Sequence, residues 1–340
     1  MNNKRILIFN VNWLGDVLFS TATIRTVKRN FPDSFLACVI PSRCYAVLKD
    51  NPYLDEIIIY DDSDRHKGFF AKLGFIRLLK RKQFDEVYLL HRSFSRALLC
   101  WLARIPRRVG YDLKKRGFLL TKKIKPMDSN MLHRIDYYLT IVEKAGLRAE
   151  DRFLDFYVSE DDKEYAESFL RKQRISKEDF TVGINPGGNW LPKRWPPEYW
   201  ARLADALIRE LHAKVLITGS PDDFALACKI RDMMKESPII ASGALNLKHS
   251  AALFKKLHIF ITGDTGPMHI ANAVGTPCII ALFGPTSPEI TGPYPLRNVT
   301  IFSKDLDCRI PCYSVNCQDN RCMKAITPEK VIEKIKEMVS

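Results

Sequence analysis

An acidic side chain, a hydroxyl and a glycine stand together at Asp264, Thr265 and Gly266, where a predicted strand meets a predicted helix. An apolar run over 257–261 precedes them, and a helical segment that ends at Gly275 follows. The first turn of a helix has unpaired N–H groups and a partial positive charge, so it suits an anion. Gly266 would let a phosphate approach the backbone closely. The pattern predicts a phosphate site, and a simple capped turn is the alternative.

A second loop of small residues follows the predicted strand 180–185 and leads into a predicted helix over 197–212. Two tryptophans and several prolines bound it. Backbone donors combined with a fixed positive charge are what a nucleoside diphosphate needs. The candidate residues of this loop are Gly187, Gly188, Lys193 and Arg194.

A carboxylate, Asp16, follows Gly15 directly after the apolar first strand, 5–10. Sites in open α/β sheets form at such strand-to-helix turns. Asp16 is therefore a candidate for acid–base chemistry, and capping of the next helix is the alternative.

The elements that position these residues alternate between strand and helix along the whole chain. The predicted strands are 5–10, 35–40, 55–60, 86–90, 107–109, 180–185, 214–218, 238–241, 258–262, 278–283 and 298–302. The predicted helices are 18–30, 43–49, 69–82, 94–103, 130–146, 160–173, 197–212, 222–236, 249–256, 266–274 and 328–339. Short apolar strands between helices are typical of parallel sheets covered on both faces, so we expect an α/β protein of two domains.

The 340 residues carry a formal net charge of +14, and nearly all of the excess lies in the first half. Residues 1–150 hold 28 Lys and Arg against 15 Asp and Glu. This asymmetry favours an anionic partner of the first half, which could be nucleic acid, an anionic membrane surface or a phosphorylated substrate, although a solvated basic face is the alternative. The densest cluster is Arg104, Arg107, Arg108, Lys114, Lys115, Arg116, Lys122, Lys123 and Lys125.

Four of the nine cysteines are clustered, at Cys308, Cys312, Cys317 and Cys322. Their spacing is not that of paired Cys-x2-Cys knuckles, so we expect reduced thiols, with a structural metal or cluster as the alternative. No apolar run is long enough to span a membrane, and the first residues lack a signal-peptide pattern. We therefore expect a cytoplasmic protein.

Taken together, the motifs resemble glycosyltransferase family 9, the ADP-heptose:lipopolysaccharide heptosyltransferases, over residues 4–335. The segments that carry the resemblance are Gly15-Asp16, Pro186-Gly187-Gly188, Lys193-Arg194-Trp195-Pro196, Gly263 to His269, and Phe283-Gly284-Pro285-Thr286. The Lys-Arg-Trp-Pro form is closest to the type II enzymes, which add the second inner-core heptose. The resemblance implies a GT-B fold, in which two Rossmann-like domains with parallel sheets face a central cleft.

The resemblance also implies the roles of the domains. Residues 1–160 would bind the acceptor and residues 175–325 the nucleotide sugar, and a helix over 326–340 would pack back on the first domain. The acceptor would be a phosphorylated lipid A–core glycolipid. The protein would act as a monomer at the inner face of the inner membrane, in peripheral contact with its anionic surface, and would bind no nucleic acid.

Inverting, metal-independent transfer from ADP-heptose is the implied reaction, with no cofactor. Asp16 matches the catalytic base, and Lys193 matches the lysine that neutralises the donor phosphates. The other candidate donor-binding residues are Gly187, Gly188, Arg194, Asp222, Asp264, Thr265, Gly266 and His269. The candidate acceptor-binding residues are Asn12, Arg92, Arg96 and Arg116.

Other functions remain open from sequence alone. The chain could be another family 9 enzyme, such as a heptosyltransferase I or III, or one with a different donor sugar. An NAD-type oxidoreductase is disfavoured because residues 10–15 contain a single glycine. A non-enzymatic membrane-surface or nucleic-acid binder is the third class. Asp62-Ser63-Asp64 spells the Asp-x-Asp pattern of metal-dependent glycosyltransferases, but the cationic Lys193 loop makes a metal redundant.

Overall fold

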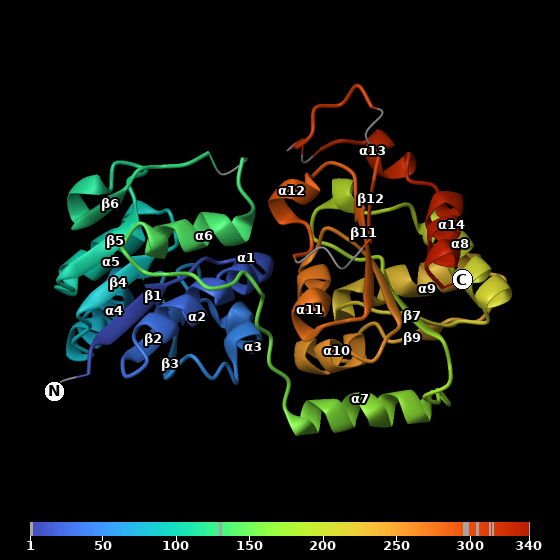
Figure 1. Cartoon of the computed structure of the whole chain (residues 1–340), viewed down its shortest axis with the longest axis horizontal. Helices are drawn as coiled ribbons and strands as arrows, with labels where there is room; N and C mark the ends of the chain where they lie inside the picture. The colour runs from blue at the N-terminus through green and yellow to red at the C-terminus, as the bar shows by residue number, and fades with distance from the viewer. Residues whose placement is uncertain are drawn as a thin grey trace. The chain divides into compact units, whose positions relative to one another are not determined.

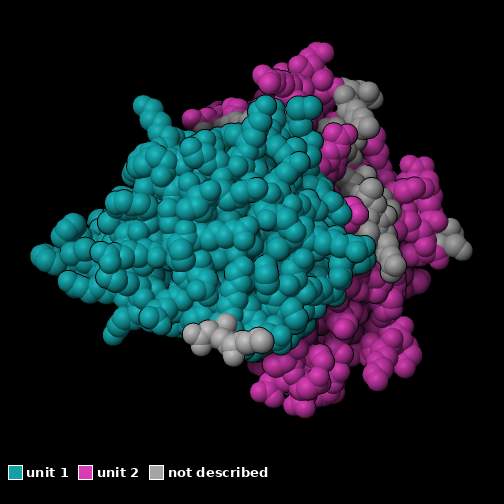
Figure 2. Space-filling model, turned by 60° about the vertical axis from the view of Figure 1, so that its left-hand side comes forward, with its two compact units in different colours: residues 1–157 teal, residues 158–340 magenta. Residues whose placement is uncertain are grey.

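The computed structural model describes residues 3–128, 131–294, 299–303, 306–312, 314 and 316–339. The chain divides into two compact units, Met1–Tyr157 and Val158–Ser340 (Figure 2). In each unit, helices cover both faces of a parallel sheet (Figure 1). Residues 130 and 298, at the ends of a predicted helix and a predicted strand, lie outside the described residues.

The sheet of the first unit has the order β3-β2-β1-β4-β5-β6, and all of its pairs are parallel. Its strands are β1 (Arg5–Phe9), β2 (Phe35–Ile40), β3 (Glu56–Ile59), β4 (Glu86–Leu89), β5 (Arg107–Tyr111) and β6 (Lys122–Ile124). This is the Rossmann order, in which the chain reverses direction across the sheet between β1 and β4. Loops after these two strands therefore meet at the switch point.

The helices of the first unit are α1 (Leu14–Phe19), α2 (Thr21–Asn30), α3 (Tyr45–Leu48), α4 (Phe69–Arg81), α5 (Phe94–Leu102) and α6 (Arg134–Glu143), with 3-10 turns η1 (Ser42–Cys44) and η2 (Gly117–Leu119). α4 packs beside α5, and α2 packs beside α6. The apolar side chains of α4, α5 and η2 form one core with those of the sheet, among them Phe75, Leu79, Ala97 and Leu119.

The second unit repeats the same order as β12-β11-β10-β7-β8-β9. Its strands are β7 (Thr181–Asn185), β8 (Lys214–Ile217), β9 (Ile239–Ile240), β10 (Ile259–Gly263), β11 (Cys278–Phe283) and β12 (Val299–Phe302). The switch point lies between β7 and β10, which pair directly. The two predicted phosphate loops, 185–196 and 262–266, follow these two strands.

The helices of the second unit are α7 (Glu160–Lys172), α8 (Pro197–Leu211), α9 (Phe224–Met233), α10 (Leu247–Phe254), α11 (Gly266–Val274), α12 (Pro288–Thr291), α13 (Arg321–Lys324) and α14 (Pro328–Val339), with 3-10 turns η3 (Leu191–Lys193) and η4 (Pro221–Asp223). The apolar face of α14, with Val331 and Ile335, packs against α8 and completes the core of its own unit. That this helix also packs back on the first domain stays a prediction.

Two local predictions were wrong. β6 was not predicted, because Lys122-Lys123-Ile124 has a single apolar residue; exposed lysines are typical of an edge strand. The first helix was predicted at 18–30. The structure starts α1 at Leu14 and separates it from α2 at Ser20, so Asp16 lies in the first turn of a helix.

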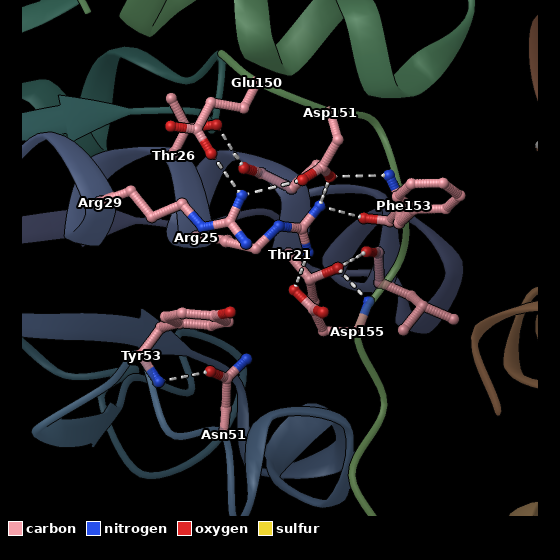
Figure 3. A network of polar contacts seen from close by, with 12 residues as sticks. Thr21, Arg25, Thr26, Arg29, Asn51, Tyr53, Glu150, Asp151, Phe153 and Asp155 are labelled. Atoms are coloured by element: carbon pink, nitrogen blue, oxygen red, sulfur yellow. Dashed lines mark hydrogen bonds and ion pairs between the residues drawn. The ribbon is translucent and has the colours of Figure 1, made fainter. Parts of the chain in front are cut away.

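An ion-pair network fastens the end of the first unit to α2 (Figure 3). The buried Arg25 guanidinium pairs with Asp151 and Asp155 and donates to the Phe153 carbonyl at 2.7 Å. The Asp155 N–H donates to Thr21 Oγ1 at 2.9 Å. The segment 151–155 is therefore part of the first unit, although it has no regular secondary structure.

Candidate functional site

The loops after β7 and β10 come together around an ion pair. Lys193 Nζ lies 2.6 Å from Asp264 Oδ2, and the Asp264 side chain is only 4% exposed. Lys193 ends η3, and Asp264 lies between β10 and α11. The two candidate donor-binding loops of the sequence are therefore joined by a direct contact at the switch point of the sheet.

Other side chains surround the Asp264 carboxylate. Thr291, at the end of α12, donates its hydroxyl to Asp264 Oδ2 at 3.1 Å. His269 Nε2 lies 3.8 Å from Oδ1, and this imidazole is buried. Lys193 Nζ also lies 5.2 Å from the centre of the Trp190 ring. Thr291 was not predicted from the sequence, because the short helix that carries it has no periodic signal.

The start of α11 has the geometry expected for an anion site. Gly266 and Pro267 open the helix, and Thr265 precedes it with extended backbone. The Thr265 side chain makes no capping hydrogen bond; its hydroxyl lies 3.1 Å from that of Thr262. The helix ends at Gly275 in the left-handed conformation, as the sequence predicted.

The two glycines of the 185–196 loop are needed because other loops approach closely. A Cβ on Gly187 would lie 2.4 Å from Asp223 Oδ1, and a Cβ on Gly188 would lie 3.2 Å from Thr265 Cγ2. Gly188 also has φ +156°, which other residues rarely adopt. The loops after β7, β8 and β10 thus converge at positions where glycine leaves no side chain between them.

Two further candidate donor-binding side chains, Arg194 and Asp222, differ in their surroundings. Arg194 Nε donates to the Gly188 carbonyl at 2.7 Å and so holds its own loop. Asp222 is exposed on η4. The neighbouring Asp223 makes the capping box with Ser220 and faces Gly187. The acidic residue of this loop that approaches the phosphate loops is therefore Asp223, one position beyond the one we predicted.

In the first unit, Asp16 is held by a buried tyrosine. The Tyr138 hydroxyl, from α6, donates to Asp16 Oδ1 at 2.9 Å. Burial, together with the charge of Asp16, raises the pKa of Tyr138 well above its usual value. The phenol therefore stays protonated and acts as a donor to the carboxylate. Asp16 itself is partly exposed at the switch point of the first sheet.

The four candidate acceptor-binding residues are placed differently from one another. Arg116 is fully buried and donates to the backbone carbonyls of Tyr111 and His91, so it holds two loops together. Arg96 is also buried and pairs with Asp62 at 2.7 Å. Arg92 is exposed. Arg116 and Arg96 are therefore buried cations that bind other parts of the first unit, whereas Arg92 is exposed.

The backbone carbonyl of Asn12 accepts hydrogen bonds from Arg43 at 3.0 and 2.8 Å, which fixes the loop before α1.

The clustered cysteines differ in burial: Cys308 and Cys317 are exposed, Cys312 is half-buried and Cys322 is buried. Across the described ranges, no three His, Cys, Asp or Glu side chains are grouped to hold a metal ion.

Comparison with known proteins decides the family. The model of glycosyltransferase family 9 (heptosyltransferase) matches residues 73–321. The chain belongs to glycosyltransferase family 9. Lipopolysaccharide heptosyltransferase 2 of Escherichia coli is 28% identical to this family 9 chain over 304 residues, which cover 85% of each protein.

Solved structures of family 9 proteins agree with this fold. A family 9 glycosyltransferase from Veillonella parvula has a TM-score of 0.88 at 27% identity, covering 99% of this chain and 97% of that one. The ADP-heptose heptosyltransferase II of Escherichia coli has a TM-score of 0.80 at 25% identity, covering 98% of both chains. The chain is thus a glycosyltransferase of the GT-B class, built from two Rossmann-like domains.

Proposed function

We propose that this glycosyltransferase moves a heptose from ADP-heptose to the inner core of lipopolysaccharide. Of the heptoses of the inner core, we propose that it adds the second. The observation that carries the proposal is the Lys193–Asp264 pair at the start of α11, beside the Gly187-Gly188 backbone. Helix N–H groups, glycine backbone and a lysine together fit a diphosphate. The similarity to relatives named lipopolysaccharide heptosyltransferase 2 and ADP-heptose heptosyltransferase II supports this donor and acceptor.

We propose that the diphosphate replaces Asp264 as the partner of Lys193. The leaving ADP gains negative charge as the glycosidic bond to phosphate breaks, and the ammonium group stabilises that charge. The released Asp264 carboxylate can then accept a hydrogen bond from a sugar hydroxyl, while Thr291 and His269 keep it in place. A divalent metal is not required in this scheme, because Lys193 and the helix start supply the positive charge.

Asp16 is the proposed general base. Its carboxylate would take the proton of the acceptor hydroxyl as that oxygen attacks the anomeric carbon from the face opposite the leaving group, so the configuration inverts. Tyr138 would orient the carboxylate and favour its ionised form through the hydrogen bond to Oδ1.

The acceptor would bring the protein to the inner face of the inner membrane. Among the described residues, no helix is both long and apolar enough to cross a bilayer. We therefore propose peripheral contact, and a monomer as the active form.

The experiment is release of ADP from ADP-heptose with a truncated lipid A–core acceptor that ends in the first heptose. GDP- and UDP-sugars serve as donor controls, and EDTA tests the metal. We expect acceptor-dependent ADP release that persists in EDTA and is lost in Asp16→Asn but kept in Asp64→Asn, the matched carboxylate of the Asp-x-Asp segment. Turnover only with another acceptor or sugar, or loss of turnover in EDTA, would contradict the respective part of the proposal.

A further inference from the structure

Exposed phenylalanines occur after three parallel strands of the first sheet, β3, β4 and β5. Phe69 and Phe70 open α4, after β3, and are 71% and 84% exposed. Phe94 opens α5, after β4, and Phe118 lies in η2, after β5; they are 37% and 72% exposed. The carboxyl ends of parallel strands lie at one edge of a sheet, so these side chains share that edge. Large apolar side chains grouped at a surface mark an interaction site.

Direct contacts tie the three loops together. The rings of Phe94 and Phe118 are 6.0 Å apart. Arg116, two residues before Phe118, donates to the His91 carbonyl just before α5. The loops that carry Phe94 and Phe118 are therefore held in a fixed position relative to each other.

The loop before α4 is attached to the same place. Arg96, in the first turn of α5, pairs with Asp62 at 2.7 Å and lies over the Tyr60 ring at 5.1 Å. His66 stacks on that ring at 4.9 Å. The loop that leads to Phe69 is thus held beside the start of α5, and the aromatic edge has a defined shape.

Exposed cations flank the four phenylalanines. Arg65, Lys67 and Lys72 lie close to the first pair in sequence, and Arg92, Lys114 and Lys115 lie close to the second; all six are exposed. Lys114 and Lys115 also have left-handed backbone, φ +51° and +57°. Such strain costs conformational energy in residues other than glycine and is found most often at functional sites.

Acidic groups of this edge leave the positive charge in excess. Asp62 is neutralised by Arg96, and Asp61 accepts from the backbone and hydroxyl of Ser42. Asp64 and Asp112 are exposed. Phenylalanines within a ring of lysine and arginine complement a surface that has apolar chains beneath anionic headgroups.

We propose that this edge, defined by Phe69, Phe70, Phe94 and Phe118 with their flanking cations, docks the enzyme on an anionic phospholipid bilayer. The phenylalanines enter the headgroup boundary, and the cations contact lipid phosphates. The inference rests on the proposed function to the extent that a lipid-linked acceptor requires the enzyme to work at a bilayer. It assigns the docking to these loops, a surface distinct from the Lys193–Asp264 pair.

The test is co-sedimentation of the full chain with vesicles of phosphatidylethanolamine and phosphatidylglycerol, without acceptor, against vesicles of phosphatidylcholine alone. We expect binding to the anionic vesicles that weakens with salt. Phe69→Ser/Phe70→Ser and Phe118→Ser should each reduce it about tenfold, and Lys114→Gln/Lys115→Gln should reduce its salt dependence. Phe224→Ser is the matched control, since this exposed phenylalanine opens α9 in the second unit.

Turnover of a deacylated, water-soluble acceptor separates this inference from the proposed function, because it needs the chemistry but no bilayer. The phenylalanine variants should keep that turnover and their unfolding midpoint. Wild-type binding that does not exceed that of Phe69→Ser/Phe70→Ser would overturn the proposal. So would equal binding to phosphatidylcholine, loss of soluble turnover, salt-sensitive binding to single-stranded RNA in place of vesicles, or a dimer that the substitutions dissociate.

Discussion

The Tyr138 hydroxyl donates to Asp16 Oδ1 at 2.9 Å, from a helix that begins more than a hundred residues later in the chain. A buried phenol whose pKa is raised remains a donor, so it favours the charged carboxylate and fixes one of its two oxygens. In the proposed mechanism, the carboxylate held in this way takes the proton of the acceptor hydroxyl. Tyr138 is therefore a positioning residue for the proposed base.

Replacing Tyr138 with phenylalanine tests this relationship. Loss of a hydrogen bond to a charged group should lower kcat/KM about tenfold and shift the acidic limb of its pH profile to higher pH. Tyr111→Phe is the control, because that buried tyrosine also loses one hydrogen bond, to the Tyr137 carbonyl, without touching Asp16. Equal pH profiles for the two variants would leave Tyr138 with a merely structural role.

Variants of the Lys193–Asp264 pair should change the free energy of unfolding and the affinity for ADP independently. Lys193→Met leaves a buried carboxylate unpaired and should lower the free energy of unfolding by about 3 kcal/mol. It should also weaken ADP binding roughly 50-fold, because a charge-assisted contact to phosphate is lost. Adding Asp264→Asn should recover most of the stability and leave ADP binding weak. Urea unfolding and calorimetric titration measure the two quantities; recovery of both would argue against Lys193 as a phosphate ligand.

Gly187→Ala should disrupt the donor loops through steric overlap. The new methyl group would lie 2.4 Å from Asp223 Oδ1, so either the capping box of η4 or the glycine loop must move. We expect ADP affinity to fall at least about tenfold, in line with the cost of overpacking. Gly68→Ala is the control, since nothing lies within 4 Å of its added Cβ. Unchanged ADP affinity in the Gly187 variant would mean that the loop does not contact the nucleotide.

The burial of His91 should make the free energy of unfolding depend on pH. Burial, followed by the charges of Arg96 and Arg116, lowers the pKa of His91 to about 4. An unfolded histidine titrates near 6.5, so between these values the unfolded chain binds more protons than the folded one. Folding stability should therefore fall as pH drops from about 6.5 towards 4. His91→Gln should flatten this part of the curve in urea unfolding, and parallel curves for wild type and variant would refute the assignment.

The two candidate donor loops could be predicted from sequence patterns because the parts of each loop are local. An apolar strand followed by a small-residue turn and a helix can be recognised in one segment, as at Ile259–Gly263 and the start of α11. The contacts that complete the site join distant segments. Thr291 reaches Asp264 from a short helix without periodicity, and Tyr138 looks like any core residue of α6 until it is seen beside Asp16.

Arg116 shows a second limit of prediction from the sequence. A Lys-Lys-Arg run reads as a solvated basic surface, and Lys114 and Lys115 are indeed exposed. Arg116 turns inward instead, because the buried carbonyls of Tyr111 and His91 need donors there. Burial lowers the pKa of this guanidinium to about 10, which still leaves it charged at neutral pH. Neighbouring positions with the same charge thus have opposite roles, and only the path of the backbone distinguishes them.

The ion-pair network of Arg25 has a consequence for synthesis of the chain. Its carboxylate partners, Asp151 and Asp155, leave the ribosome 126 and 130 residues after Arg25 itself. Until then a nascent first unit holds a buried guanidinium without its counter-ions, which disfavours the closed fold. Domains generally fold as they emerge, but the closed form of this one gains both counter-ions of Arg25 only after Asp155 has left the ribosome. The segment that leads towards the second unit is therefore also the last part that the first unit needs in order to fold.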